Sequence, residues 1–190
     1  KIYIQVTFHY KIINNLINNK MKIIQIKNQV EGYATINFGN INMMDIVKNG
    51  NVSILNGKSF TWDKSLNSAI SDCPFYIGAT PIFLTEKLGH ALDDSNVNMA
   101  TFDVEGKNYT IVLAPVLNVN SINVSESKCR TFRSGKIMDV NEYVFTSGVD
   151  YPEIFTPQEF GLFTFCNESI AKQLFSCHFN QLNFVECSIV

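Results

Sequence analysis

The segment 161–187 carries the pattern that most constrains the fold of this chain: a short strand, a capped helix and a returning strand. An apolar, aromatic-rich run ends at Asn167, a residue type that caps helix N-termini. Glu168 follows in the first turn, where a negative charge suits the helix dipole. Ile170 and Leu174 then give a short helix one apolar face. Strand character resumes after that helix.

The same pattern occurs earlier in the chain, at 81–104. A gapless alignment pairs Thr85 with Asn167, Glu86 with Glu168, Leu88 with Ile170, Leu92 with Leu174 and Phe102 with Phe184. Two copies in one register indicate a pseudo-duplicated domain, because a solenoid needs at least about three repeats. We therefore predict an α+β fold, with a mainly antiparallel sheet and short capped helices, in which 81–104 and 161–187 are pseudo-duplicated strand–helix–strand units.

Length and composition favour one globular domain over 21–190, with two lobes at 21–75 and 76–190 as the alternative. The 190 residues are 46% apolar and 17% charged, which is enough apolar material to bury a core. Residues 1–20 contain lysines but no acid, and they precede Met21. We interpret 1–20 as a leader or an added extension.

Several sequence features predict a cytoplasmic protein. No apolar run approaches the ~18 residues of a membrane span, and the first residues lack the apolar core of a signal peptide. The five cysteines are odd in number and form no C-x-x-C pair, so we expect buried free thiols in a reducing compartment. The formal net charge of −2 argues against a nucleic-acid binder that neutralises phosphates.

Catalytic and metal-binding patterns are weak. His90, Asp93 and Asp94 have the spacing of ligands on one helix face, but a solvated surface helix has the same pattern. Cys177 and His178 are sequence neighbours, and adjacent side chains on an extended segment point apart. The chain contains no phosphate-binding loop and no nucleophile elbow. We therefore predict no enzyme, no cofactor and no metal.

The segment 53–64 combines a turn signal with the only tryptophan of the chain. Asn56-Gly57 separates two short strand-like runs and predicts a hairpin, because both residues tolerate positive φ. Trp62 is either a core anchor or an exposed contact residue, since Asp63 and Lys64 follow it.

Charge is distributed unevenly after residue 127. Four bases surround a Ser134-Gly135 turn: Lys128, Arg130, Arg133 and Lys136. The segment 137–171 then contains no lysine or arginine, and its acids are Asp139, Glu142, Asp150, Glu153, Glu159 and Glu168. Such a run is either a solvated face or a recognition surface for a basic partner, where complementary charge speeds encounter.

Four stretches resemble the C-terminal half of a family of bacterial polymorphic-toxin immunity proteins: 109–113 (YTIVL), 119–127 (VNSINVSES), 153–155 (EIF) and 163–168 (FTFCNE). The likeness covers roughly residues 70–187. The chain departs from the family pattern at Asn123, where an aspartate is usual, and at Thr85 and Asn167, where serine is common.

The resemblance implies a cytoplasmic α+β protein, encoded beside a toxin, that binds and neutralises the cognate toxin domain without a catalytic site. Such a protein needs a rigid scaffold and one complementary patch. The residues we expect to contact the toxin are Asp139, Glu142, Asp150, Glu153, Glu159, Trp62 and Asn123. The alternative is a small-ligand-binding domain or an unrecognised enzyme with a pocket between the two pseudo-repeats, near Trp62 and His90.

Overall fold

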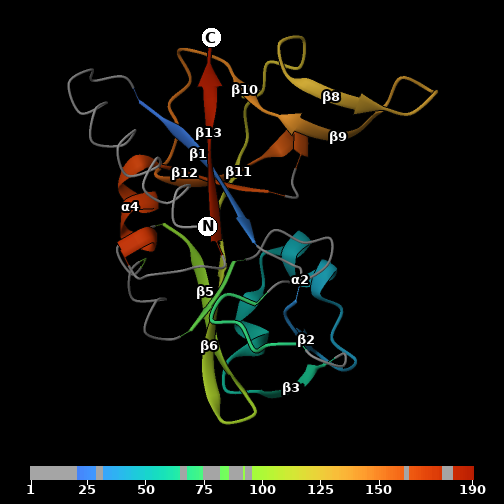
Figure 1. Cartoon of the computed structure of the whole chain (residues 1–190), viewed down its shortest axis with the longest axis vertical. Coiled ribbons are helices and arrows are strands. Elements are labelled where there is room, and N and C mark those ends of the chain that lie inside the picture. Colours follow the sequence, from blue (N-terminus) through green and yellow to red (C-terminus); the bar gives the residue numbers. More distant parts are fainter. Residues whose placement is uncertain are drawn as a thin grey trace.

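In a computed structural model, the described part of the chain forms two β-sheets, a two-stranded ribbon and short helices (Figure 1). The structure describes residues 21–28, 32–64, 68–74, 82–85, 92, 96–160, 163–176 and 182–190. The predicted leader, 1–20, lies outside these residues. Most strand pairs are antiparallel and the helices are short, which confirms the predicted α+β class.

The larger sheet has six strands in the order β10-β13-β1-β12-β11-β7. In chain order these are β1 (Ile23–Asn28), β7 (Val116–Leu117), β10 (Val144–Phe145), β11 (Ile154–Pro157), β12 (Thr164–Asn167) and β13 (Leu182–Ile189). A short 3-10 helix, η3 (Gln158–Phe160), follows β11. β1 lies inside the sheet with Ile23, Ile24 and Ile26 all buried, so both of its faces are covered. A largely apolar run is typical of a strand in that position, although the buried Gln25 interrupts it here.

The second predicted strand–helix–strand unit is confirmed. Helix α4 (Glu168–Ser176) connects β12 to β13, and these two strands flank β1, each antiparallel to it. The side-chain oxygen of Asn167 accepts a hydrogen bond from the Ile170 N–H at 2.9 Å, as expected of an N-cap. Ile170 and Leu174 are buried. Their helix therefore forms where its cap and its apolar spacing predicted it.

The smaller sheet has five strands in the order β2-β3-β5-β6-β4. These are β2 (Thr35–Asn37), β3 (Ser59–Asp63), β4 (Ile82–Thr85), β5 (Asn98–Val104) and β6 (Lys107–Leu113), accompanied by α2 (Met43–Asn49) and the 3-10 helix η1 (Val52–Leu55). β4 and β5 flank β6 and are antiparallel to it, just as β12 and β13 flank β1. The two predicted units thus share one strand arrangement; residues 86–91, where the first helix was expected, lie outside the described part of the chain.

The hairpin predicted at Asn56-Gly57 is wrong. The residues before this turn form η1, and β3 pairs with β2 and β5 instead. The turn itself is bound to β5: the Asn56 side chain accepts from the Thr101 N–H at 3.0 Å, and the Gly57 N–H donates to the Thr101 carbonyl at 3.0 Å. These hydrogen bonds hold the turn against β5, and residues 52–55 before it form η1 instead of pairing with β3.

The two sheets divide the chain differently from the two lobes considered above. β1 belongs to the sheet of the C-terminal strands, whereas β5 and β6 join β2 and β3. An apolar cluster with members such as Ile24, Val112 and Leu174 joins one sheet to the other. In the described residues, no helix has the length and apolar character that crossing a membrane requires.

Candidate protein-binding surface

A two-stranded ribbon projects sideways from the larger sheet (Figure 1). We call residues 128–142 the arm; it consists of β8 (Lys128–Thr131), β9 (Ile137–Glu142) and the turn between them. The Phe132 N–H donates to the Lys136 carbonyl at 2.8 Å, and the Gly135 N–H donates to the Phe132 carbonyl at 2.9 Å. Gly135 has a φ of 80°, the left-handed conformation that closes three-residue hairpin loops. The turn predicted at Ser134-Gly135 is therefore confirmed.

β9 carries one extra residue at two places along the arm. The pairing shifts between Lys128 and Cys129 and again between Arg130 and Thr131, so Asn141 and Met138 have no directly opposite residue. Such bulges increase the twist of a ribbon and interrupt the hydrogen-bonding edge that another strand could join. The arm is therefore suited to contact through its side chains rather than through its backbone edge.

Apolar side chains anchor the base of the arm to the larger sheet. Val140 is buried and Cys129 packs against the same cluster, which includes Phe165; Ile137, next to the turn, also packs against this cluster. Tyr143, just after β9, meets the ring of Phe165 edge-on with the ring centroids 5.0 Å apart. The arm thus has a packed inner side and a free outer side.

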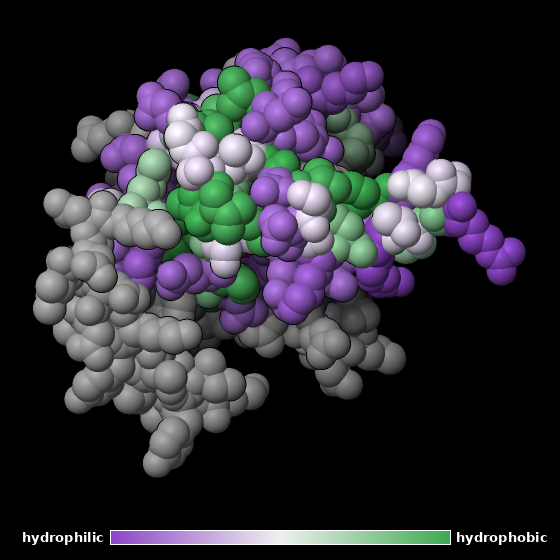
Figure 2. Space-filling view, turned by 90° about the horizontal axis from the view of Figure 1, so that it is seen from above, coloured by the Kyte–Doolittle hydropathy of each residue, from purple (hydrophilic) through white to green (hydrophobic). Residues whose placement is uncertain are grey.

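The outer side of the arm exposes large apolar and cationic side chains together. Phe132 is 51% exposed and Met138 is 47% exposed. Arg130, Arg133 and Lys136 are also exposed, and no ion pair within the described ranges involves them. Seen from above, the arm extends beyond the body and ends in hydrophilic side chains (Figure 2). Aromatic, methionine and arginine side chains are enriched where proteins contact one another.

Two acids of the predicted acidic recognition surface lie on β9, and each of them faces a base on β8. Lys128 donates to Glu142 Oε1 at 2.6 Å across the arm, and Arg130 stands directly opposite Asp139. Asp139 also accepts from the Val140 N–H at 2.8 Å. Strand pairing therefore places the basic cluster against the start of the acidic segment.

Glu159 has an internal role instead of a surface one. Its carboxylate accepts from the N–H groups of Ser121 and Ile122, at 2.5 and 3.1 Å, and from the Ser121 hydroxyl at 3.4 Å. Ser121 and Ile122 are buried. Glu159 therefore holds the 119–122 loop against η3.

Asp150 and Glu153 are the acids of the segment that remain available at the surface. Both are exposed in the loop between β10 and β11, and in the described part of the chain neither side chain forms an ion pair. Nearby, Tyr151 is buried and donates its hydroxyl to the carbonyls of Thr146 and Ser121. The role predicted for Asp150 and Glu153 in partner binding stays a prediction.

Trp62 is a core anchor and not an exposed contact residue. Its side chain is 7% exposed, and its ring meets Tyr109 edge-on at a centroid distance of 5.5 Å. The Trp62 N–H donates to Glu105 at 3.2 Å, and Lys64 donates to the same carboxylate at 2.9 Å. These hydrogen bonds, that from Lys64 foremost, lower the pKa of Glu105.

Asn123 is half-buried and closes a local turn. Its side-chain oxygen accepts from the Ser125 hydroxyl at 2.7 Å and from the Glu126 N–H at 3.3 Å, and its carbonyl accepts from the Ser127 N–H at 3.0 Å. A side-chain oxygen that replaces a backbone acceptor in this way is the usual reason for an asparagine in a turn. The internal hydrogen bonds account for Asn123 without a partner.

Apolar side chains of the described residues occupy part of the space expected to hold a pocket between the pseudo-repeats. Leu92 of the first unit and Leu174 of the second are both completely buried in the cluster that joins the two sheets. Cys166 belongs to that cluster, and burial raises the pKa of its thiol to about 12. This apolar packing counts against a ligand pocket among these residues.

The other expected chemistry falls largely outside the described residues. His90, Asp93, Asp94, Cys177 and His178 all lie there. Among the residues that are described, no cluster of histidine, cysteine, aspartate and glutamate could hold a metal ion.

The sequence shows the basic cluster and its turn, but its charge pattern favours the acidic segment as the contact surface. Two signals pointed to the arm: a Ser134-Gly135 turn, and a large aromatic residue, Phe132, between polar neighbours with no apolar periodicity around it. An aromatic residue in that setting has little apolar material beside it to pack against.

Two comparisons with known proteins give no relative: the chain matches no model of a known family and no curated protein. The likeness to immunity proteins therefore rests on the stretches named in the sequence analysis.

Proposed function

We propose that this protein is a cytoplasmic immunity protein that binds a cognate toxin domain and neutralises it through protein–protein contact. The observation that carries the proposal is the arm, which holds Phe132 and Met138 exposed on a well-anchored ribbon beside three cations. The stretches between residues 70 and 187 that resemble an immunity family supply the class of partner.

The body of the protein suits a binding role because it is packed on both faces of the larger sheet. Apolar clusters lie on both sides of β1, one around Ile24 and Leu174 and the other around Phe145 and Phe165. A packed scaffold loses little conformational freedom on binding, and only the surplus over that loss appears as affinity. The arm is therefore carried on a packed scaffold.

The test is a pull-down of the tagged full-length chain with the C-terminal domain encoded by the gene immediately upstream. We expect a one-to-one complex, and we expect co-expression of the chain to restore growth to cells that produce the toxin domain. A folded chain that neither binds this domain nor restores growth would overturn the proposed function.

A further inference from the structure

We propose that the tip of the arm is the element that contacts the toxin, and that its partner is an acidic surface with an apolar hollow. Phe132 fills the hollow, while Arg133 and Lys136 pair with carboxylates around it. This inference rests on the proposed function and names its contact surface. The partner is thus opposite in charge to the basic partner that the acidic segment suggested.

The charge balance of the chain supports an acidic partner. The arm contains four bases against two acids, whereas residues 143–190 contain one base, Lys172, against five acids. Within the arm, Glu142 pairs with Lys128 and Asp139 stands opposite Arg130. The positive surplus therefore lies at the tip, on Arg133 and Lys136.

The position of the tip directs this surplus outward from the larger sheet. The arm points outward from the larger sheet (Figures 1 and 2), and the ion pairs found in the described residues leave Arg133 and Lys136 unused. A positive tip on a projecting ribbon attracts an acidic surface from a distance, and salt weakens that attraction.

The side chains at the tip have the chemistry of a binding centre. Binding energy concentrates in a few aromatic and arginine residues that become fully desolvated, with less important contacts around them. Phe132 provides the aromatic side chain, and Arg133 provides a planar fork that can pair with a carboxylate through two hydrogen bonds. The hydrogen bonds of the turn and the left-handed Gly135 fix the backbone that presents both residues.

The bulges of β9 disfavour a second way of binding, the addition of a partner strand along the β9 edge. A partner strand could extend the ribbon only along a regular edge, and the extra residues Met138 and Asn141 interrupt β9 at both ends. Met138 is exposed at the bulge closer to the tip. Contact through side chains is therefore the mode that the β9 side of the arm favours.

The experiment measures the affinity of full-length variants for the upstream-encoded toxin domain by titration calorimetry at low and high salt. The two test variants are Phe132→Ala and Lys136→Glu. Their controls are Ile54→Ala, which also truncates a half-exposed apolar side chain, and Lys58→Glu, which makes the same charge reversal; both residues lie in the region of the smaller sheet. A third variant, Asp150→Lys with Glu153→Lys, tests the acidic surface.

We expect Phe132→Ala to weaken binding by roughly 30-fold, the loss typical of a central aromatic residue. Lys136→Glu should weaken binding by about tenfold at low salt and by less at high salt, because salt screens the charges. Ile54→Ala, Lys58→Glu and the Asp150/Glu153 double reversal should bind like the unchanged chain.

Three outcomes would overturn the inference. If the unchanged chain binds and restores growth while both arm variants bind equally well, the arm is not the contact and the proposed function stands. If the unchanged chain does not bind, the proposed function fails and the role of the arm fails with it. If Phe132→Ala instead abolishes self-association in sedimentation, or binding of the isolated chain to a 20-base-pair DNA duplex, the arm serves a second copy or nucleic acid.

Discussion

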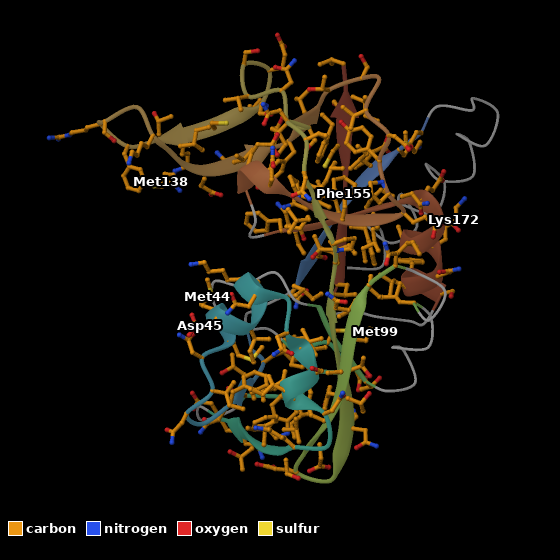
Figure 3. The ribbon with its side chains drawn as sticks, turned by 180° about the vertical axis from the view of Figure 1, so that it is seen from behind. Met44, Asp45, Met99, Met138, Phe155 and Lys172 are labelled. Carbon is orange, nitrogen blue, oxygen red and sulfur yellow. The ribbon has the colours of Figure 1, made fainter. Side chains whose placement is uncertain are left out.

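The arm and the buried face of the larger sheet use similar side chains in opposite ways. Phe145, Phe155 and Phe165 are each at most 1% exposed and their rings contact one another, whereas Phe132 of the arm is 51% exposed. Figure 3 shows the same contrast between Phe155, inside the sheet, and Met138, out on the arm. The comparison teaches that stability and recognition reside in separate parts of this molecule.

Phe145→Ala should have the largest effect on stability. Phe145 is completely buried, and its ring meets those of Phe165 and Tyr151 edge-on at 5.0 and 5.6 Å. Removing it should lower the free energy of unfolding by about 3–5 kcal/mol through lost burial and a cavity. Urea unfolding followed by circular dichroism measures this, and Phe145→Leu should cost less. A loss near zero would break the contrast between body and arm.

Glu159→Ala should have the next largest effect, although Glu159 is an acid within the segment expected to bind a partner. Its removal leaves the buried N–H groups of Ser121 and Ile122 without their acceptor, which costs roughly 1–3 kcal/mol. Glu153→Ala is the matched control, since that exposed side chain forms no ion pair within the described chain. Equal stability of the two variants would show that Glu159 has no internal role.

Alkaline pH should weaken the body through its buried thiols. Burial raises the pKa of Cys166 and of Cys187 from 9.0 to about 12. Between pH 9 and pH 12 the thiols lose their protons in the unfolded chain but keep them in the folded chain. Their contribution to the free energy of unfolding is therefore complete below pH 9 and declines as pH rises toward 12. Each thiol lowers the unfolding free energy by about 1.4 kcal/mol per pH unit.

The measurement is urea unfolding at pH 8, 8.5, 9 and 9.5, where the tyrosines of the unfolded chain, with a reference pKa of 10.0, are still mostly protonated. Cys166→Ala should reduce the slope by the share of one thiol. An unchanged slope in that variant would contradict the assignment to Cys166.

Asn167→Ala should lower stability by about 1 kcal/mol, because the cap that accepts from the Ile170 N–H is lost. Asn167→Asp should retain most of the stability, since aspartate also caps helices. Thermal unfolding of the two variants distinguishes them. A loss of the same size in both would indicate that packing at this position, and not the cap, is what matters.

Phe132→Ala should have the smallest effect on stability. A half-exposed residue on the turn of the arm contributes less than about 0.5 kcal/mol to the free energy of unfolding. Combined with its expected loss of binding, this result would sharpen the separation of body and arm. A loss of stability as large as that of Phe145→Ala would show that Phe132 belongs to the core.

The sequence predicted best where the deciding contacts lie within a few residues of each other. One short helix and its cap show this: Asn167 caps the helix, Ile170 and Leu174 are buried on it, and all three are found as expected. The hairpin at Asn56-Gly57 failed because Thr101, far away in the chain, binds that turn. Trp62 presented two alternatives, and its contact with Tyr109 decided between them.

The charge pattern shows the same limit for the candidate site. In the sequence, the bases before residue 137 and the acids after it form separate blocks. Antiparallel pairing of β8 with β9 places Lys128 beside Glu142 and Arg130 opposite Asp139. A count of charged residues along the sequence cannot show this, because the opposite charges are brought together across two neighbouring strands.

The sequence by itself determined the α+β class, the strand–helix–strand unit at 161–187 and the turn at Ser134-Gly135, because these depend on local preference and short-range periodicity. The tertiary structure alone decided which strands share a sheet, that Glu159 and Trp62 point inward, and that Phe132 remains outside. Those outcomes depend on contacts between distant residues. Burial is a property of the completed packing, and no single stretch of the chain specifies it.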